Sequence, residues 1–390
     1  MRAFERIPRT VRGLAAVSLF NDFASEMVYP LLPAFVTTVL GAGAVTLSAL
    51  DGAADLTAAV LKWASGWLSD RPGWRKPLIL AGYGTAVLIR PLIALANSAG
   101  QVIGFRVLDR VGKGLRTPPR DALIADSAPP ELHGRAFGFH RGADHLGAVA
   151  GSVAAWWFLS RHAEVRQVIE WSAVPGVVVL VALAVVLRGS DGAGKVADPP
   201  PVAAAPDPSR AYWAPVLTLA VFALARLPET LLLLRLQQVG VALPLIPLAW
   251  AGLHMVRSGA SYPGGRLNDH LGPSAGILVG AAIYGATLYA LAIAASPLAS
   301  MGAFLALGLA AGATESAERT LVARLSPRRQ GRGFGGYHAV TGFAALPAAL
   351  LFGAAYAHAA GTALTLSAGL TMVSAVLWVV VGRRIPMPTR

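Results

Sequence analysis

Carboxylates occur inside apolar stretches of this sequence, where an ionised group is costly. Asp22 and Glu26 stand four residues apart in one apolar run and therefore share one face of a helix. A charge at the centre of a bilayer costs about 2.5–3.5 kcal/mol on insertion scales. Two acids on one face cannot both ionise cheaply, so these two are the first candidates for binding a proton. The second candidates, in later runs, are Glu229, Glu315 and Glu318.

Basic side chains accompany these acids in the same kind of run. The guanidinium group is suited to bidentate capture of a carboxylate or phosphate. Bases and acids nearly balance within the runs, which favours a polar, zwitterionic or anionic solute over a lipophilic cation. The candidates for lining a polar cavity are Arg116, Arg120, Arg141, Asp144, His145, Arg226, His254, Arg257, Arg319 and His338. For each charge the alternative is a structural ion pair that joins two helices, and for each histidine a hydrogen-bonding neighbour.

A short, basic, glycine-rich turn separates two of the runs at residues 66–76, and a weaker copy returns at residues 265–270. Two further pairs of segments match in the same way. Arg120–Ile124 corresponds to Arg319–Ala323, and Gly134–Gly138 corresponds to Gly331–Gly335. Repetition at about half the chain length indicates two homologous halves.

The composition requires these charged groups to be positioned by membrane helices. The 390 residues are 55% hydrophobic and only 14% charged, and the mean hydropathy is +0.57. Unbroken apolar runs of about 20 residues predict transmembrane helices and exclude the alternating strands of a β-barrel. We predict twelve, at about 12–38, 44–68, 77–97, 102–126, 135–158, 168–187, 212–237, 244–267, 275–296, 299–324, 333–358 and 361–382.

The net charge of +13 follows the predicted topology. Most Lys and Arg outside the runs fall in one set of alternate loops and in both tails, whereas the opposite loops hold Arg161 and Arg166. Basic loops mark the cytoplasmic side, so we expect a multi-pass inner-membrane protein with both termini cytoplasmic and no nucleic-acid partner. Asp22 and Glu26 interrupt the first run, which argues against a cleaved signal sequence. The chain has no cysteine, which excludes disulfides and thiolate metal sites.

One polar, Pro/Gly/Ala-rich segment at 188–210 lacks periodicity and predicts a cytoplasmic linker. We therefore expect a six-helix bundle at 1–187 and a second one at 211–390.

With these features, the chain resembles the major facilitator superfamily. Residues 66–76 match the family's GxxxDRxG(R/K) motif, except that Trp74 stands where a basic residue is usual. The segments at 110–116 and 337–342 look like a prokaryotic subgroup without an assigned substrate. The resemblance implies an all-α fold of two pseudo-symmetric six-helix bundles around a central cavity. It also implies a gate in which the loop clamps the second helix to the eleventh, made by Gly66, Asp70, Arg71, Gly73, Arg75 and Asp126.

The function expected from this resemblance is proton-coupled export of a small polar, zwitterionic or amphiphilic solute. Gly147–Ser152 partly matches the family's antiporter motif GxxxGP, with Ser152 in place of proline. Small residues at this spacing also serve close helix packing. The alternatives are a proton symporter that imports an organic anion, a lipid flippase, and a membrane receptor without transport.

No catalytic motif or metal-ligand spacing appears, so we expect no enzyme activity, cofactor or metal. The expected partners are the solute, protons and membrane lipids, and we expect a monomer.

Overall fold

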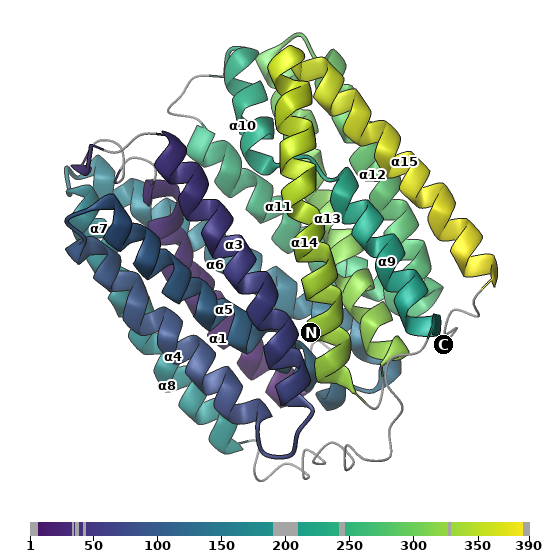
Figure 1. Ribbon diagram of the computed structural model, residues 1–390, viewed down its shortest axis with the longest axis horizontal. Coiled ribbons are helices and arrows are strands. Elements are labelled where there is room, and N and C mark those ends of the chain that lie inside the picture. Colours follow the sequence, from purple (N-terminus) through teal and green to yellow (C-terminus); the bar gives the residue numbers. More distant parts are fainter. Residues whose placement is uncertain are drawn as a thin grey trace. The chain divides into compact units, whose positions relative to one another are not determined.

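All regular secondary structure in the described residues is helical. The computed structural model describes residues 7–32, 35, 39–41, 44–189, 210–241, 246–326 and 329–384. The helices (Figure 1) are α1 (Arg9–Val28), α3 (Ala44–Ser69), α4 (Arg75–Leu92), α5 (Ala99–Ser127), α6 (His133–Ser160), α7 (Val165–Trp171), α8 (Ala173–Gly189), α9 (Arg210–Ala225), α10 (Glu229–Gln238), α11 (Ile246–Leu271), α12 (Pro273–Ile293), α13 (Pro297–Leu325), α14 (Gln330–His358) and α15 (Ala360–Arg384). Three short 3-10 turns are η2 (Tyr29–Leu31), η4 (Ile93–Leu95) and η5 (Pro130–Leu132).

The predicted runs coincide with these helices, which confirms the all-α fold. Two runs contain a pair of helices where one was predicted. The run at 168–187 begins in α7 and continues in α8. The run at 212–237 is broken between α9 and α10, because Pro228 has no N–H and disfavours helical geometry in the residue before it.

Some helices are long and apolar enough to cross a membrane on length and composition alone. Among the described residues these are Arg75–Leu95, Val165–Leu187, Pro273–Ile293, Pro297–Leu325 and Ala360–Val381. In contrast, α1, α5 and α11 carry several charged side chains along their length. A polar helix in a membrane fold must direct these groups toward other helices or toward water.

Contacts divide the chain into two compact units. Unit 1 comprises Met1–Pro129, Ala143–Ala205 and Arg328–Ala339, and unit 2 comprises Pro130–Gly142, Pro206–Pro327 and Val340–Arg390. The boundary therefore falls inside α6 after Gly142 and inside α14 after Ala339. The predicted linker at 188–210 lies almost entirely outside the described residues.

Helix packing follows the same plan within each unit. In unit 1, α5 packs against α3 and α4, and α1 packs against α8. In unit 2, α13 packs against α11 and α12, and α9 packs against α15. Counted along the predicted runs, these are the same partners: the second and third on the fourth, and the first on the sixth. The two halves of the sequence thus fold alike.

The turns that precede α4 and α12 show the same repetition. Gly73 has a φ of 77° and Gly272 has a φ of 86°, a left-handed conformation that favours glycine. The pairs Gly73/Gly272, Asp70/Asp269 and Gly66/Gly265 all have the same separation in sequence. The structure therefore explains why this turn recurs at half the chain length.

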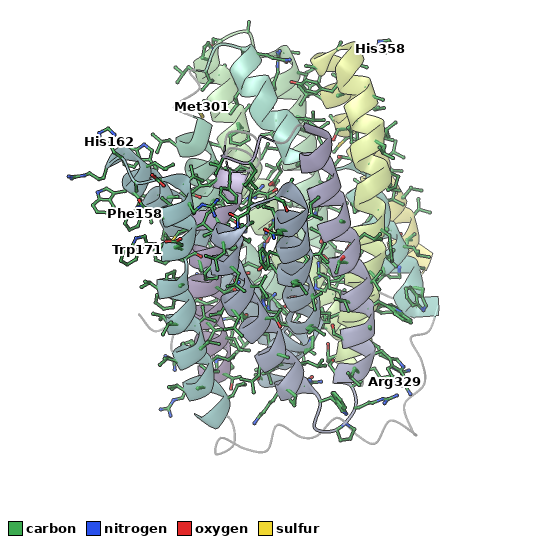
Figure 2. All side chains as sticks on the ribbon, turned by 60° about the vertical axis from the view of Figure 1, so that its left-hand side comes forward. Phe158, His162, Trp171, Met301, Arg329 and His358 are labelled. Atoms are coloured by element: carbon green, nitrogen blue, oxygen red, sulfur yellow. The ribbon has the colours of Figure 1, made fainter. Side chains whose placement is uncertain are left out.

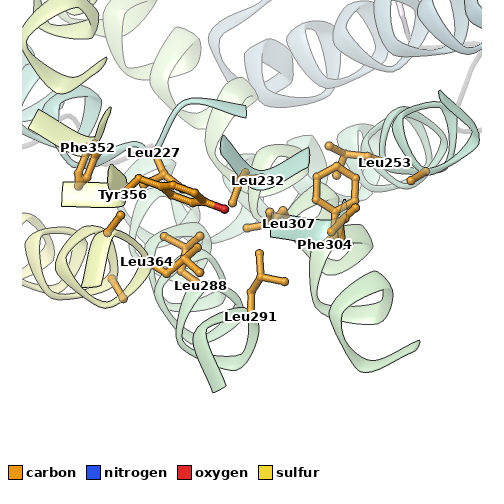
Figure 3. Close-up of a cluster of buried hydrophobic side chains, with 14 of the residues drawn as sticks. Leu227, Leu232, Leu253, Leu288, Leu291, Phe304, Leu307, Phe352, Tyr356 and Leu364 are labelled. Atoms are coloured by element: carbon orange, nitrogen blue, oxygen red, sulfur yellow. The ribbon is translucent and has the colours of Figure 1, made fainter. Parts of the chain in front are cut away.

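An apolar core fills one end of unit 2. Figure 3 shows Tyr356 near Leu227, Leu288 and Leu364, all of them buried. The Tyr356 hydroxyl donates to Gln238 Oε1 at 2.8 Å, so its polar end is satisfied while its ring packs with the leucines.

Aromatic side chains mark the end of unit 1 that carries α7. Phe158 stacks on Trp171 with ring centroids 6.0 Å apart (Figure 2). Trp171 is 53% exposed. Trp rings are common at membrane–water interfaces, so this cluster suits the surface of a bilayer.

Candidate functional site: intramembrane charges and two helix locks

Asp109 on α5 lies at the centre of a dry cluster of charges in unit 1. Its Oδ1 is 3.2 Å from Arg90 Nη2, and its Oδ2 is 3.3 Å from Arg106 Nη1. Arg90 also donates to the backbone oxygen of Asn21 at 3.1 Å and to its side-chain oxygen at 3.3 Å. All four residues are buried. This arrangement joins α1, α4 and α5, as expected of a structural ion pair.

The two acids of α1 have different surroundings. Asp22 Oδ1 accepts a hydrogen bond from Asn21 Nδ2 at 2.9 Å. Glu26 Oε2 is buried and accepts no hydrogen bond from any described residue. Around Glu26, the charged neighbours are Asp22, Lys113, Arg110 and Arg106. The Glu26 carboxyl therefore lies near one acid and several bases, and one of its oxygens has no described hydrogen bond.

Arg120, Asp121 and His338 form a second cluster within unit 1. Arg120 donates to Asp121 Oδ1 from Nε at 3.0 Å and from Nη2 at 2.8 Å. His338 Nε2 lies 2.9 Å from the other oxygen, Asp121 Oδ2. Arg120 also reaches Ser18 on α1 at 3.4 Å. The cluster thus connects α1, α5 and the first turns of α14.

Arg116 has no such partner. Its Nη1 donates to the Gly82 carbonyl at 3.3 Å, and its guanidinium lies 4.8 Å from the centroid of the Tyr83 ring. No described residue forms an ion pair with it. Arg116 is buried, so this cation is held by a carbonyl and an aromatic face.

In unit 2, every predicted proton-binding acid is bonded to a predicted arginine. Glu318 Oε1 accepts from Arg226 Nη2 at 2.5 Å, and Glu229 accepts from Arg257. Glu315 accepts from Arg141 Nε, while its backbone oxygen accepts from Arg319 Nη1 at 2.8 Å. In unit 2, the acids predicted to bind protons and the arginines predicted to line the cavity therefore form ion pairs with one another.

The break between α9 and α10 places one residue of each of two pairs beside irregular backbone. Arg226 is the first residue after α9, and Glu229 is the first residue of α10. The freed N–H of Leu227 donates to Tyr284 Oη at 2.9 Å. Broken helices at membrane depth are tolerated where they are buried in protein or line a polar cavity.

Three other predicted cavity residues, Asp144, His145 and His254, also lie in the helices. Asp144 and His145 on α6 are both buried, and Asp144 interacts electrostatically with Arg120. His254 packs edge-on against Trp250, with ring centroids 4.8 Å apart. These residues border the charged clusters.

The predicted gate residue Asp70 caps the amino end of α14. Its two oxygens accept from the N–H groups of Gly331 at 2.7 Å and Arg332 at 2.8 Å. The first N–H groups of a helix have no partner within the helix, and a carboxylate there also meets the positive end of the helix dipole. We call this contact the first lock. Burial raises the pKa of Asp70, because desolvation outweighs the two N–H groups and the nearby Arg75 and Arg332, which lower it.

Close backbone contact surrounds the first lock. A Cβ at Gly66 would come within 2.5 Å of Gly335 Cα and would also overlap the Gly331 carbonyl. Only glycine allows α3 and α14 to approach this closely. Nearby, Arg75 Nη1 is 2.5 Å from Asp126 Oδ2, which joins the start of α4 to the end of α5. Arg71 stacks on Trp67, 3.9 Å from the ring centroid.

Asp269 makes the same contact to α6 within unit 2. Its oxygens accept from the N–H groups of Gly134 at 2.8 Å and Arg135 at 3.1 Å, and from Arg135 Nε at 2.6 Å. We call this the second lock. Burial raises the pKa of Asp269 although the bonds from Arg135 and Gly134 lower it. A Cβ at Gly265 would overlap the Gly134 carbonyl, as at the first lock.

Sequence reasoning did not assign roles to Asp121, Asp269 or Arg90. The weaker copy of the turn contained the signal for Asp269, since it repeats the aspartate of the first copy. Nothing in the sequence indicates that Arg90 contacts Asp109 or that Asp121 contacts His338. Such contacts depend on how neighbouring helices are rotated.

Fold and charges together define a class of protein: a helical membrane protein with two similarly folded halves, paired charges inside its spans and glycine-rich turns that cap distant helices. The chain belongs to the major facilitator superfamily, since the model of the Major Facilitator Superfamily matches residues 14–259. It therefore has the multi-pass membrane fold of a transporter, and transporters of this family are not enzymes.

Known proteins with similar sequences or structures support this assignment. The chain is 29% identical over 356 residues to the uncharacterized MFS-type transporter MJ1317 of Methanocaldococcus jannaschii, a match that covers 89% of this chain and 88% of that protein. It is 30% identical over 157 residues to the multidrug resistance protein MdtH of Photorhabdus laumondii, covering 40% and 38% of the two chains. The crystal structure of the human organic anion transporter MFSD10 (TETRAN) superposes with a TM-score of 0.77 at 17% identity, covering 95% and 99%.

Proposed function

We propose that this protein exports a small polar, zwitterionic or amphiphilic solute across the inner membrane in exchange for protons. The observation that carries the proposal is the carboxyl group of Glu26. Its Oε2 is inaccessible and accepts no hydrogen bond within the described part of the chain, and Asp22 lies nearby on the same helix. A group in this setting can take up a proton at low cost and lose it when a cation approaches.

The pairs around the broken helix of unit 2 supply the proposed solute site. Arg226 and Glu229 are bonded to Glu318 and Arg257, and both flank the irregular backbone at Leu227. A solute that carries both charges can compete for an arginine and a glutamate together. Discontinuous helices near the midplane are a common place for solute sites in secondary transporters.

The two locks supply the proposed gates. In each lock an aspartate at the carboxyl end of one helix bonds the first turn of a helix far away in sequence, so breaking the lock frees that helix end. Asp70 directly follows α3, and Asp269 lies in the last turn of α11. In the proposed division into bundles at 1–187 and 211–390, the first lock joins the second helix to the eleventh and the second lock joins the eighth to the fifth. Alternating access then requires these contacts to form and break in turn.

The proposed direction of transport, export, is inferred from sequence similarity and not from the arrangement of side chains. Gly147 and Gly151, the glycines of the partial antiporter motif, lie against the backbone carbonyls of Leu19 and Phe23 on α1. Close packing explains these glycines without reference to direction. Export is favoured by the similarity to a protein named for multidrug resistance.

Import of an organic anion with protons is the second candidate function. Arg116 favours it, because this buried cation forms no ion pair with any described residue and can accept an anionic group. The similar fold of a structure named as an organic anion transporter is consistent with this alternative.

A flux assay in proteoliposomes distinguishes the two. The probes are a radiolabelled zwitterionic amino-acid mixture, fluorescein as an organic anion and ethidium as a lipophilic cation. Antiport predicts accumulation of the zwitterions when the vesicle interior is acidic, whatever the orientation of the protein. Accumulation of fluorescein driven by an acidic exterior would instead establish symport.

A further inference from the structure

The helices α6 and α14 begin with matching sequences and matching locks. Gly134–Gly138 corresponds to Gly331–Gly335, and each first glycine donates its N–H to a buried aspartate of a lock. In this register Arg141 of α6 corresponds to His338 of α14. Both stand about two helical turns beyond the lock, on the same side of the helix as the locked glycine.

Each of these residues contacts an acid on the fourth helix of a half. Arg141 Nε bonds Glu315 on α13, and the two side chains are 20% and 18% exposed. His338 Nε2 bonds Asp121 on α5 at 2.9 Å, and the two side chains are 8% and 1% exposed. The equivalent positions 141 and 338 therefore each contact an acid of a fourth helix, although the two acids are not equivalent, since Asp121 corresponds to Thr320. The contact at α14 is drier and uses an imidazole.

The two contacts respond differently to pH. Arginine keeps its charge at every physiological pH, so the basic partner of the Arg141–Glu315 pair does not titrate. Histidine is the side chain that ordinarily changes charge between about pH 5 and 8. A hydrogen bond from a charged imidazolium is shorter and stronger than one from a neutral ring.

We propose that His338 and Asp121 form a protonation-dependent latch: the charged imidazole holds the start of α14 against α5, and loss of the proton releases it. The latch rests on the proposed gating function, because α14 is the helix that the first lock caps. It adds a proton site to the acids predicted from the sequence. It also makes the two locks unequal, since the matching contact of α6 cannot titrate in this way.

The surrounding charges determine what a proton does at this site. On α5, Asp121 Oδ1 accepts hydrogen bonds from Arg120, and Asp121 Oδ2 lies beside His338 Nε2. Arg120 in turn interacts with Asp144 of α6 and Tyr83 of α4. On α14 itself, the Tyr337 ring lies 4.8 Å from the imidazole. The negative charges of Asp121 and Asp144 therefore oppose the positive charges of Arg120 and of a protonated His338.

The absence of cysteine in the chain permits a direct test of the latch with spin labels. One labelled pair, Trp74→Cys with Arg329→Cys, reports on the first lock and the start of α14. A matched pair, Glu131→Cys with Leu271→Cys, reports on the second lock and the start of α6. Distances between labels are measured by pulsed electron paramagnetic resonance on the full-length protein at about pH 5.5 and 8.0.

The ratio of close to separated labels at the first lock should fall about tenfold between these pH values in the otherwise unmodified protein. His338→Gln should remove this change, and His338→Arg should keep the labels close at both pH values. Asp70 and Asp269 also titrate, but each lock contains one, so their effect appears at both labelled pairs. Any pH response at the first lock that exceeds the response at the second lock is therefore assigned to His338.

The reciprocal variant, Arg141→His, keeps the proposal testable if the variants at His338 fail to fold. Arg141→His should give the second lock a larger pH response between about pH 5 and 8 than it has in the otherwise unmodified protein. The proposal is wrong if His338→Gln leaves the response of the first lock unchanged, or if Arg141→His adds none to the second. If the latch responds but no probe accumulates in proteoliposomes under any gradient, the proposed transport function fails and the latch stands.

Discussion

Asp109 bonds two buried guanidinium groups, and its replacement should reveal how much stability one carboxylate supplies. Asp109→Asn removes the carboxylate that Arg90 and Arg106 share. Breaking a buried pair typically costs about 3–5 kcal/mol, so the temperature of unfolding in detergent should fall clearly. The matched control is Asp126→Asn, because Asp126 is 32% exposed and a pair at that exposure contributes about 0–1 kcal/mol. Equal effects of the two variants would contradict this interpretation of Asp109.

Asp70 is the residue whose loss should affect flux most with the least effect on folding. Asp70→Asn removes the charge that accepts two helix N–H groups, and hydrogen bonds to charged groups contribute about 1.5–3 kcal/mol each. We expect flux in proteoliposomes to fall about tenfold while the protein remains monodisperse. Trp74→Ala, in the same exposed loop, should keep normal flux. Normal flux in Asp70→Asn would remove the proposed role of the first lock.

The buried locks also predict how stability depends on pH. Since burial raises the pKa of Asp70 and Asp269, the folded protein binds protons more readily than the unfolded chain. The stabilising contribution is therefore complete below the ordinary aspartate pKa, about 3.9, and is lost as pH rises through the raised values. Thermal unfolding measured upward from about pH 4 should show this loss. The double variant Asp70→Asn with Asp269→Asn should show a smaller loss over the same range.

At the scale of elements, the sequence was sufficient to predict the helices but not which side chains of neighbouring helices contact one another. Apolar runs predicted every span, because burial in lipid imposes length and composition on each helix separately. The break at Pro228 was missed, since the residues around it are apolar on both sides. Contacts such as Arg90 with Asp109 depend on helix rotation and depth, which no single run encodes. A contact between the loop of the gate motif and the eleventh predicted helix was expected from the family resemblance and not from the apolar runs.

The glycine contacts between α3 and α14 give a prediction for these elements. Gly66→Ala places a methyl group against the backbone of Gly331 and Gly335, which cannot move aside as a side chain can. We expect the labels at the first lock to separate at every pH. Gly84→Ala on α4 is the control, because nothing lies within 4 Å of its added carbon. Alanine there should stabilise the helix by about 0.5–1 kcal/mol. Unchanged label distances in Gly66→Ala would show that the close approach is not required.

At the scale of the whole molecule, the two compact units pack their helices alike but differ in their charges. In unit 1, Glu26 Oε2 accepts no hydrogen bond from a described residue, Arg116 forms no ion pair with one, and His338 contacts Asp121. In unit 2, Glu229, Glu315 and Glu318 are each bonded to an arginine. In the proposed mechanism, the sites that exchange protons therefore lie in unit 1.

Proton-coupled export is tested most directly by accumulation of a radiolabelled zwitterionic amino-acid mixture in proteoliposomes with an acidic interior. The proposal predicts accumulation above equilibrium that collapses when an ionophore removes the pH gradient. Glu26→Gln should abolish this accumulation, whereas Trp74→Ala should not. Accumulation that ignores the gradient, that requires an acidic exterior, or that persists in Glu26→Gln would contradict proton antiport through this site.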